Sequence, residues 1–481
     1  MSSIEKKNES NSDISPQVSE LLDSDFENKN VFALKEDGPN FRGVTWIGAA
    51  GLVAKTQFGY GILGLPGTFQ VLGFVPGLIS LISLCALTTW TGYMVGSFRI
   101  RYPNVYGVGD AAELIFGPVG REFMGGAFWL FYTLCYGAAV LTLSIAFNAI
   151  TEHATCTMVW VAIGAVIALV IGTGTRTLKN MSWLGLVALG SVFFSVWPVT
   201  IAVLAQSTPE AAPAGEPIDK QIVAVATGRS FAAIASAIAT QLSGLCATAA
   251  FFTIHSEMRN PRDFTKSLLL GQGFVSANYI IVTCIIYGRV GRYVTSPALG
   301  SAGPLMMKIC YGIALPGLFF SCFFQAHIAG KHALVRLLRD TKHLQANTKT
   351  HWFTWISMML LVVIIGFVIA SSIPFFNDLL ALIAALLGSL FTLIMPAILG
   401  IYIMSDYHKQ EGDGLFAWVG YYGKNWNKNR RNIMHSVVAV LAIAFGLFIL
   451  VGGTYGAIDS IIDGYRTGRV SRAFSCEDNS N

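Results

Sequence analysis

Charged residues are scarce in this chain. Only 12% of its 481 residues are Asp, Glu, Lys or Arg, whereas 53% are apolar and the mean hydropathy is +0.57. Ordinary soluble domains carry about one-quarter charged residues, so soluble domains of this total length could not be covered with polar surface. The 32 Phe, 16 Tyr and 10 Trp in long apolar runs also exclude collagen, coiled-coil and disordered proteins. The composition therefore predicts a protein that crosses a membrane several times.

Groups that support enzymatic chemistry are scarce as well. The eight cysteines form no CxxC pair and no zinc-type cluster with histidine, so we expect no structural metal and no cofactor. Cys156, Cys310 and Cys476 lie near or beyond the ends of apolar runs and could pair, but no spacing selects a pair. There is no GxxxxGK[ST] loop and no Asp or Glu near the centre of an apolar run, which argues against an ATPase or another enzyme. The net charge of +5 is too small to indicate nucleic-acid binding.

The chain divides into two tails and a long apolar region. Residues 1–43 hold nine of the 27 acidic residues and no apolar run, so we expect a disordered amino-terminal tail. Residues 44–455 form a transmembrane domain with eleven runs that can each cross a bilayer of about 30 Å as a helix. Residues 456–481 form a carboxyl-terminal tail. The expected spans are residues 44–72, 74–98, 123–150, 158–174, 182–205, 228–256, 266–288, 309–330, 353–372, 378–403 and 434–455.

The positive charges divide unevenly between the two sides of these spans. With the amino-terminal tail placed inside, 23 of the 32 Lys and Arg residues fall in inside segments, eight in outside segments and one within a span. The positive-inside rule then predicts a cytoplasmic amino terminus and, after eleven crossings, an external carboxyl terminus. Arg466, Arg469 and Arg472 in the last segment argue mildly against the final crossing.

Two of the apolar runs contain residues that interrupt a helix. The first run holds Gly59, Gly61, Gly64 and Pro66 within eight residues. Each internal glycine costs about 1 kcal/mol relative to alanine, and proline removes a backbone donor. The sixth run is over-long and holds Ser-Gly-Leu-Cys-Ala-Thr-Ala-Ala, residues 243–250, at its centre. The alternative, that the glycines only allow another helix to approach closely, stays open.

The two interrupted runs stand in equivalent positions of two halves with five crossings each. Because five is odd, the second half enters the membrane from the opposite side, and paired interrupted helices in such an inverted repeat mark a transport site near the midplane. An unwound turn frees N–H groups at one helix end, which favour an anion, and C=O groups at the other, which favour a cation. Such a site suits a zwitterionic amino acid.

Four segments of the chain, taken in order, resemble the fungal branch of the amino acid/auxin permease family, and the likeness covers about residues 43–455. The segments are Gly59-Tyr-Gly-Ile-Leu-Gly-Leu-Pro66, Phe251-Phe-Thr-Ile-His-Ser-Glu-Met-Arg-Asn-Pro-Arg-Asp-Phe264, Ala326-His-Ile-Ala-Gly-Lys-His-Ala-Leu-Val-Arg-Leu-Leu-Arg339 and Ile373-Pro-Phe-Phe-Asn-Asp378. The resemblance implies an all-α transporter with eleven helices, a five-plus-five inverted-repeat fold and broken helices 1 and 6. It also implies transport of neutral or aromatic amino acids across the plasma membrane, usually coupled to protons.

The resemblance further implies which residues hold the substrate. In the first break they are Gly59, Tyr60, Gly61 and Ile62, and the amides of the last three would meet the carboxylate. The backbone that would receive the ammonium group is that of Cys246, Ala247 and Thr248.

Two ionisable residues are candidates for ion coupling. Lys55 lies about eleven residues into the first run, roughly 16 Å deep at 1.5 Å per residue, and either snorkels to the surface or serves an ion pathway. Sodium-coupled transporters that share the fold place a cation between the first and eighth helices, and we hypothesise that the Lys55 ammonium replaces it. His327 in the eighth run would face the same region and could relay protons. The alternative for His327 is a hydrogen-bonded packing role.

Four aromatic residues are candidates for gating. Tyr132 and Tyr136 are four residues apart and therefore share a helical face, and Phe251 and Phe252 follow the second interruption. Packing alone is the alternative for all four.

The sequence therefore predicts a secondary active amino acid transporter that works by alternating access in lipid, with protons and without a nucleic-acid partner. The rival from another class is a non-transporting amino acid sensor on the same scaffold, whose acidic tail would signal. A channel is disfavoured, since no pore-lining helix repeats with charged rings.

Overall fold

The computed structural model describes residues 43–174, 178–210, 212, 218–339, 341, 343, 348–373, 375–408, 413–467 and 472–480. Apart from Gly43, the expected disordered tail lies outside the described residues. Helices make up most of the described chain, and an isolated bridge pairs Val44 with Met258.

The α-helices in chain order are α2 (Trp46–Gln57), α3 (Leu65–Leu72), α4 (Phe74–Arg101), α5 (Val108–Thr151), α6 (Thr157–Gly174), α7 (Leu178–Ala205), α8 (Phe231–Ser243), α9 (Phe251–Glu257), α10 (Phe264–Val290), α11 (Pro304–Leu337), α12 (Lys349–Ser372), α13 (Phe376–Ile383), α14 (Met395–Ser405), α15 (Ala417–Asn425), α16 (Arg430–Phe448) and α17 (Thr454–Arg466). Tighter 3-10 turns are η1 (Tyr60–Gly64), η2 (Thr248–Ala250), η3 (Pro261–Asp263), η4 (Gly291–Tyr293) and η5 (Ala298–Ala302). Wider π-helical turns are η6 (Ala384–Gly388), η7 (Leu390–Ile394) and η8 (Ile449–Gly453).

The helices confirm an all-helical protein with many crossings. In the described part of the chain, nine helical stretches are long and apolar enough to cross a membrane, and the bent pair from α13 to α14 makes a tenth. The first expected span is present as α2, η1 and α3, which follow one another but are each too short to cross alone. Five spans precede α8. The span that begins with α8 and the four that follow it form the second half, which is therefore inverted relative to the first, and the span of α16 and α17 comes after both halves.

Small polar residues begin several of these helices. The side chains of Thr45, Ser230, Thr348 and Asn429 each accept a hydrogen bond from the backbone N–H three residues further on, at the start of α2, α8, α12 and α16. Such caps satisfy amide groups that have no partner inside the helix. Both broken spans therefore begin at a defined residue.

Three helices extend well beyond the expected spans. α5 begins at Val108 because the chain stays helical on both sides of a kink at Gly117, which has φ +72° and precedes Pro118. α11 runs from Pro304 to Leu337, and the last span continues through η8 and α17 to Arg466. The expected spans were shorter because an apolar run predicts only the part of a helix that lies in lipid, whereas the helix itself continues into more polar residues at its ends. The short helix α15 lies in a segment expected to be a loop.

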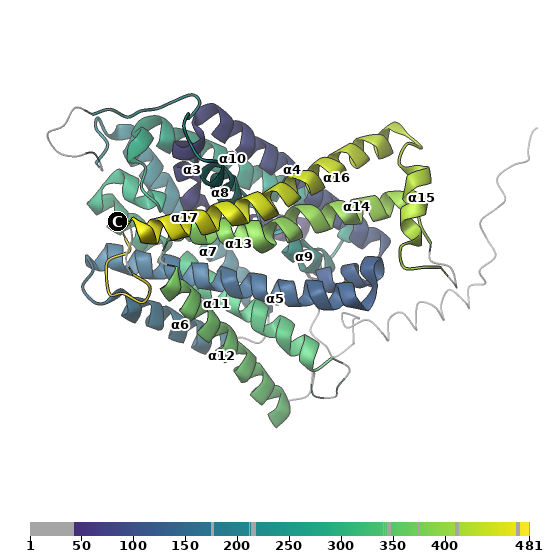
Figure 1. Cartoon of the computed structure of the whole chain (residues 1–481). Helices are drawn as coiled ribbons and strands as arrows, with labels where there is room; N and C mark the ends of the chain where they lie inside the picture. Colours follow the sequence, from purple (N-terminus) through teal and green to yellow (C-terminus); the bar gives the residue numbers. More distant parts are fainter. Residues whose placement is uncertain are drawn as a thin grey trace, which may run out of the picture.

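The helices pack as two groups (Figure 1). In the scaffold group, α5, α6, α11 and α12 all pack against one another. In the bundle group, α10 packs along α2, α3 and α4, and α3 packs against α8. Both broken spans belong to the bundle group, and the scaffold group consists of helices that continue across.

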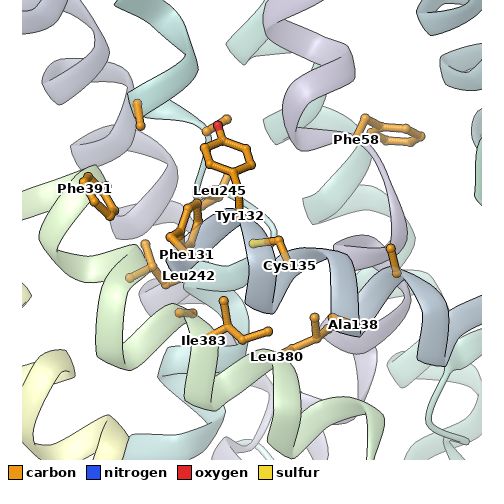
Figure 2. Packing of buried hydrophobic residues seen from close by; sticks show 14 of the residues in the cluster. Phe58, Phe131, Tyr132, Cys135, Ala138, Leu242, Leu245, Leu380, Ile383 and Phe391 are labelled. Atoms are coloured by element: carbon orange, nitrogen blue, oxygen red, sulfur yellow. The ribbon is translucent and has the colours of Figure 1, made fainter. Parts of the chain in front are cut away.

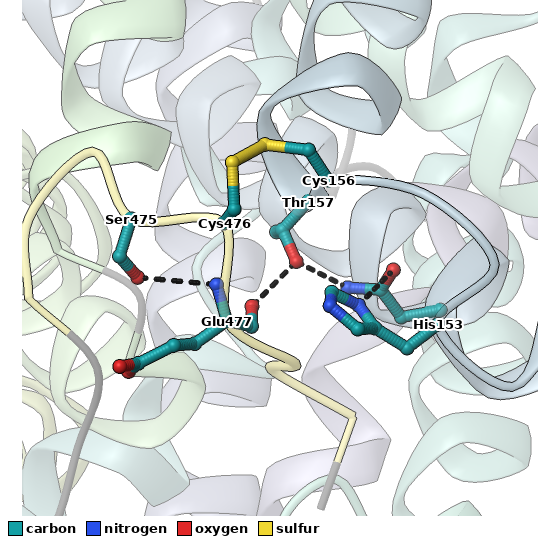
Figure 3. Close-up of a disulfide and its surroundings, with 7 residues drawn as sticks. His153, Cys156, Thr157, Ser475, Cys476 and Glu477 are labelled. Atoms are coloured by element: carbon teal, nitrogen blue, oxygen red, sulfur yellow. Dashed lines mark hydrogen bonds between the residues drawn. A yellow bond between two sulfur atoms is a disulfide. The ribbon is translucent and has the colours of Figure 1, made fainter.

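The carboxyl-terminal residues 472–480, here called the strap, lie against the ends of α5 and α6 (Figure 3). A disulfide joins Cys476 to Cys156, between those two helices. The Thr157 hydroxyl donates to the Glu477 carbonyl at 2.6 Å. The sequence allowed Cys156 and Cys476 to pair but gave no reason to choose them. The pairing depends on where the last helix ends, which spacing along the chain does not reveal.

Candidate functional site

The first interrupted helix is broken where its glycines stand. α2 ends at Gln57, and Gly59 adopts φ −147° and ψ −142°, which is far from helical. The chain then makes the 3-10 turn η1 before α3 begins at Leu65. Pro66 stands in the first turn of α3, where its missing N–H leaves no partner unsatisfied. The prediction of a broken first span is confirmed.

The second interrupted helix is broken at the expected segment. α8 ends at Ser243, and the chain does not turn helically again until Thr248. Two side chains fasten the end of α8: the Ser243 hydroxyl donates to Thr240 O at 2.7 Å, and the Cys246 thiol donates to Leu242 O at 3.2 Å. The prediction of a broken sixth span is confirmed.

The two breaks touch each other through their glycines. A Cβ atom on Gly61 would lie 2.7 Å from the Cα of Gly244, a distance that no real side chain tolerates. Glycine at 61 is therefore required for the first break to reach the second. The carboxyl ends of α2 and α8 and the starts of η1 and η2 lie near this contact, and such helix ends carry backbone groups that have no partner inside their own helix.

A cavity of about 70 Å³ lies beside this contact, between the breaks and the scaffold group. The residues that line it come from both breaks, α5, α11, α13 and η6. They are Lys55, Thr56, Gln57, Gly59, Tyr60, Gly61, Phe131, Tyr132, Cys135, Ser243, Cys246, Ala247, Ser321, Phe324, Gln325, Leu380, Ile383 and Ala384. Small-molecule pockets commonly measure about 300–1,000 Å³, so a bound molecule of that size requires the walls to separate.

Seven of the residues predicted for the site line this cavity. They are Lys55, Gly59, Tyr60, Gly61, Tyr132, Cys246 and Ala247. Ile62 and Thr248 are each 1% exposed and do not line the cavity. The Tyr60 hydroxyl donates to the Cys135 carbonyl of α5 at 3.2 Å, which connects the first break to the scaffold group.

The four candidate gating residues separate into one that lines the cavity and three that do not. Tyr132 lines it, with its ring 4.6 Å from that of Phe128 between centroids. Figure 2 shows it with the other apolar side chains of α5, α8 and α13 that gather there. Tyr136 packs instead against α12, where a Cβ on Gly366 would meet its ring at 2.2 Å. Phe251 and Phe252 are buried outside the cavity wall.

Lys55 brings a positive charge to the cavity. Its side chain is 8% exposed, and Nζ lies 5.0 Å from the centroid of the Phe320 ring on α11. In the part of the chain that the structure describes, no carboxylate oxygen lies within 4.0 Å of Nζ. A buried ammonium without a carboxylate attracts an anion or a polarisable ring.

His327 packs against α6 and α12 and does not line the cavity. Its Nδ1 is 3.3 Å from Gly172 O of α6, and its ring packs against Trp355 of α12 at 5.4 Å. Gln325, two residues earlier on α11, faces the cavity instead. A helix turns by about 200° over two residues, so these two side chains cannot share a face.

The sequence analysis missed several polar residues in the cavity wall. Gln57 donates to Gln272 Oε1 at 2.7 Å, and Gln272 in turn donates to Thr88 at 3.0 Å. Gln325 and Ser321 supply the polar groups of α11. The available signal was an amide in a mostly apolar run, because a buried amide requires partners.

A model of one protein family matches most of the chain. Its description is transmembrane amino acid transporter protein, and the match covers residues 42–459. The chain belongs to this family. It is therefore a transporter and not an enzyme, and the resemblance to the amino acid/auxin permease family is confirmed at the level of the family.

Two fungal relatives are similar over nearly their whole length. A transmembrane transporter of Fusarium pseudograminearum is 32% identical over 94% of this chain and 91% of its own. The N amino acid transport system protein of Neurospora crassa is 28% identical over 92% of this chain and 90% of its own.

Solved structures show the fold. Mhp1 in its inward-facing conformation matches with a TM-score of 0.54 at 15% identity, over 91% of this chain and 94% of its own. MhsT in complex with L-phenylalanine matches with a TM-score of 0.54 at 12% identity, over 84% of this chain and 98% of its own. The transporter has the five-plus-five inverted-repeat fold that these proteins share.

Proposed function

We propose that this transporter is a secondary active carrier of neutral amino acids, aromatic ones included, that works by alternating access and is coupled to protons. The observation that carries the proposal is the contact between the two breaks beside a cavity whose described lining residues include no Asp or Glu. Helix ends of both polarities suit the two charges of an amino acid backbone. The scaffold group and the bundle group supply the two bodies that move against each other.

The two breaks divide the recognition of the amino acid backbone between them. Amides of Tyr60, Gly61 and Ile62, next to Gly59, bind the carboxylate in our proposal. Carbonyls around Cys246, Ala247 and Thr248 receive the ammonium group. Supporting observations are the uncapped starts of η1 and η2, where no side chain occupies the first amides.

The remaining walls favour an uncharged side chain. Phe131, Tyr132, Phe324, Leu380 and Ile383 supply apolar surface to the cavity. A cationic substrate would find no carboxylate among the described lining residues. MhsT, which is similar in fold, is in complex with L-phenylalanine, and this supports an aromatic substrate here. Tyr132 is the best placed of the four candidate gates, and Tyr136, Phe251 and Phe252 act through packing.

Lys55 replaces a coupling cation in this proposal. Its ammonium lies beside Phe320 of α11, so it already holds a positive charge between the first and eighth spans. Transport would then need no sodium, and protons would supply the driving force. His327 is the weaker candidate for proton transfer, since it contacts α6 and α12 instead of the cavity.

Orientation follows from charge and from the disulfide. The excess of Lys and Arg on the side of Val44 favours a cytoplasmic amino terminus. Disulfides persist in oxidising compartments, so the pair Cys156–Cys476 supports an external strap. We propose the plasma membrane as the location, residues 1–43 as a cytoplasmic tail and residues 44–455 as the transport domain.

Uptake by proteoliposomes tests the proposal. With an acidic external solution and no sodium, we expect saturable, concentrative uptake of labelled phenylalanine or leucine, and much less uptake of lysine. Lys55→Ala should lower the initial rate about tenfold, as expected for loss of a central charge, and weaken its dependence on pH. Lys308→Ala is the matched control, because Lys308 pairs with Glu152 at the helix end.

Other results would contradict parts of the proposal. Ligand-induced thermal stabilisation without accumulation would favour the sensor. Uptake that requires sodium would contradict proton coupling. Unchanged rates and pH dependence in both Lys55→Ala and His327→Ala would remove these residues from the coupling mechanism.

A further inference from the structure

A buried hydroxyl lies between the two broken helices. Tyr279, on α10, has no exposed surface. Its hydroxyl oxygen is 2.8 Å from Gln57 O, at the end of α2, and 3.0 Å from Gly244 O, just past the end of α8. One side chain from a third helix thus reaches the carbonyl ends of both breaks.

Packing fixes the ring that carries this hydroxyl. The Tyr279 ring stacks on Phe58 with centroids 5.9 Å apart and planes 25° apart. A Cβ on Gly244 would lie 3.0 Å from Tyr279 Cε2, so the ring is also close to the second break. The ring therefore has little freedom to move away from either break.

The hydroxyl of Tyr279 lies between two helix ends that carry negative partial charge. The last carbonyls of a helix have no partner within it and carry the negative end of the helix dipole. Two such ends that approach each other repel. The hydroxyl proton between them lowers that repulsion, but it can serve Gln57 O or Gly244 O at any one moment.

We propose that Tyr279 is a positioning residue that fastens the two breaks to each other, so that they move as one unit during transport. Tyr279 itself does not line the cavity, whereas Gln57 and Ser243, one at each fastened end, do. The hydroxyl sets the distance between the two surfaces that hold the substrate backbone. This inference rests on the proposed function and explains how the two breaks keep a fixed distance in the substrate site.

Tyr279→Phe tests the proposal because it keeps the ring and removes the hydroxyl. Tyr287→Phe is the matched control: Tyr287 is buried on the same helix, but its ring packs against Phe69 and Phe74. In Tyr279→Phe we expect KM for phenylalanine uptake to rise about tenfold, since a buried carbonyl loses its partner. We expect the amount of folded protein and Vmax to change less than about twofold.

Cys246 provides a second readout that packing alone would not change. It lines the cavity within the second break, so a small maleimide should modify it more slowly when phenylalanine is bound. In Tyr279→Phe we expect this protection to need about tenfold more phenylalanine, in step with the rise in KM. Tyr287→Phe should be protected as the unsubstituted protein is.

Two results would overturn the proposal. The first is a Tyr279→Phe protein with unchanged KM and unchanged protection of Cys246. The second applies if Tyr279→Phe does not fold: Gly244→Ala is then measured instead, because its added Cβ displaces the Tyr279 ring while the hydroxyl remains. An unchanged KM in Gly244→Ala would also overturn the proposal. A protein without substitutions that takes up no neutral amino acid contradicts the proposed function instead.

Discussion

The two broken helices occupy equivalent places but differ in how they are broken. The first break has three glycines and a proline within eight residues, and its Gly59 has open space around it. The second break has one glycine, Gly244, and side-chain hydrogen bonds from Ser243 and Cys246 fasten it. The local sequence is sufficient to interrupt the first helix. The second depends on contacts with α10 and with the first break.

The two breaks also differ in the chemistry that they bring to the cavity. Lys55 and Gln57 lie just before the first break and supply a charge and an amide. Ser243, Cys246 and Ala247 at the second supply small side chains. The two equivalent breaks therefore present different side chains to the cavity: a charge and an amide at the first, and small groups at the second.

Replacing Gly61 by alanine is the change with the largest expected effect. The new Cβ would lie 2.7 Å from Gly244 Cα, and backbone cannot move aside as a side-chain tip can. We expect uptake to fall about 100-fold, the range of a severe overpacking penalty. Initial rates in proteoliposomes, normalised to folded protein, measure this.

Gly273→Ala is the matched control for that change. Gly273 lies on α10 outside the cavity wall and has no neighbouring atom within 4 Å of an added Cβ, so uptake should stay within about threefold. If both variants transport equally well, the two breaks are not in contact in the working protein.

Alkylation of two native thiols compares the side of the cavity formed by the second break with the side formed by the scaffold group. Cys246 lies in the second break and Cys135 on α5 of the scaffold group, and both line the cavity. With phenylalanine at ten times its Kd, we expect modification of both to slow about tenfold by mass action. Peptide mass spectrometry measures the two sites separately.

Cys284 is the control thiol, because it is half-buried on α10 and does not line the cavity. Its rate should not respond to phenylalanine. Protection of Cys284 equal to that of Cys246 would indicate a general change in accessibility and not a shared binding site.

Pro66→Ala has the smallest expected effect. The glycines before it already end the helix, and proline in a first helical turn removes no needed hydrogen bond. Uptake should change less than about threefold. A loss as large as that of Gly61→Ala would mean that Pro66, and not the glycines, sets the first break.

Much of the fold could be predicted because lipid imposes helices on long apolar runs. The position of each break also followed from local residues, clearly at Gly59 and Gly61 and more weakly at Gly244. The cavity wall was harder to predict. Gln325 and Leu380 reach it from the eighth and tenth spans, and which face of a helix turns inward depends on packing among several helices.

Residues that act through tertiary contact left no signal in the sequence. Tyr279 is an ordinary tyrosine in an apolar run, and its role depends on two carbonyls that are more than 30 residues away along the chain. His327 is a second example. The sequence left a proton relay and a packing role open, and the contacts of its ring with α6 and α12 depend on tertiary packing that the sequence does not reveal.

The disulfide between Cys156 and Cys476 requires an even number of membrane crossings between the two cysteines. They are 320 residues apart in the sequence, and every span from α6 to α17 lies between them. If one of these spans failed to insert, the two thiols would end in different compartments and could not meet. A non-reducing gel of the newly made chain would then distinguish molecules that completed an even number of later crossings from those that lost one.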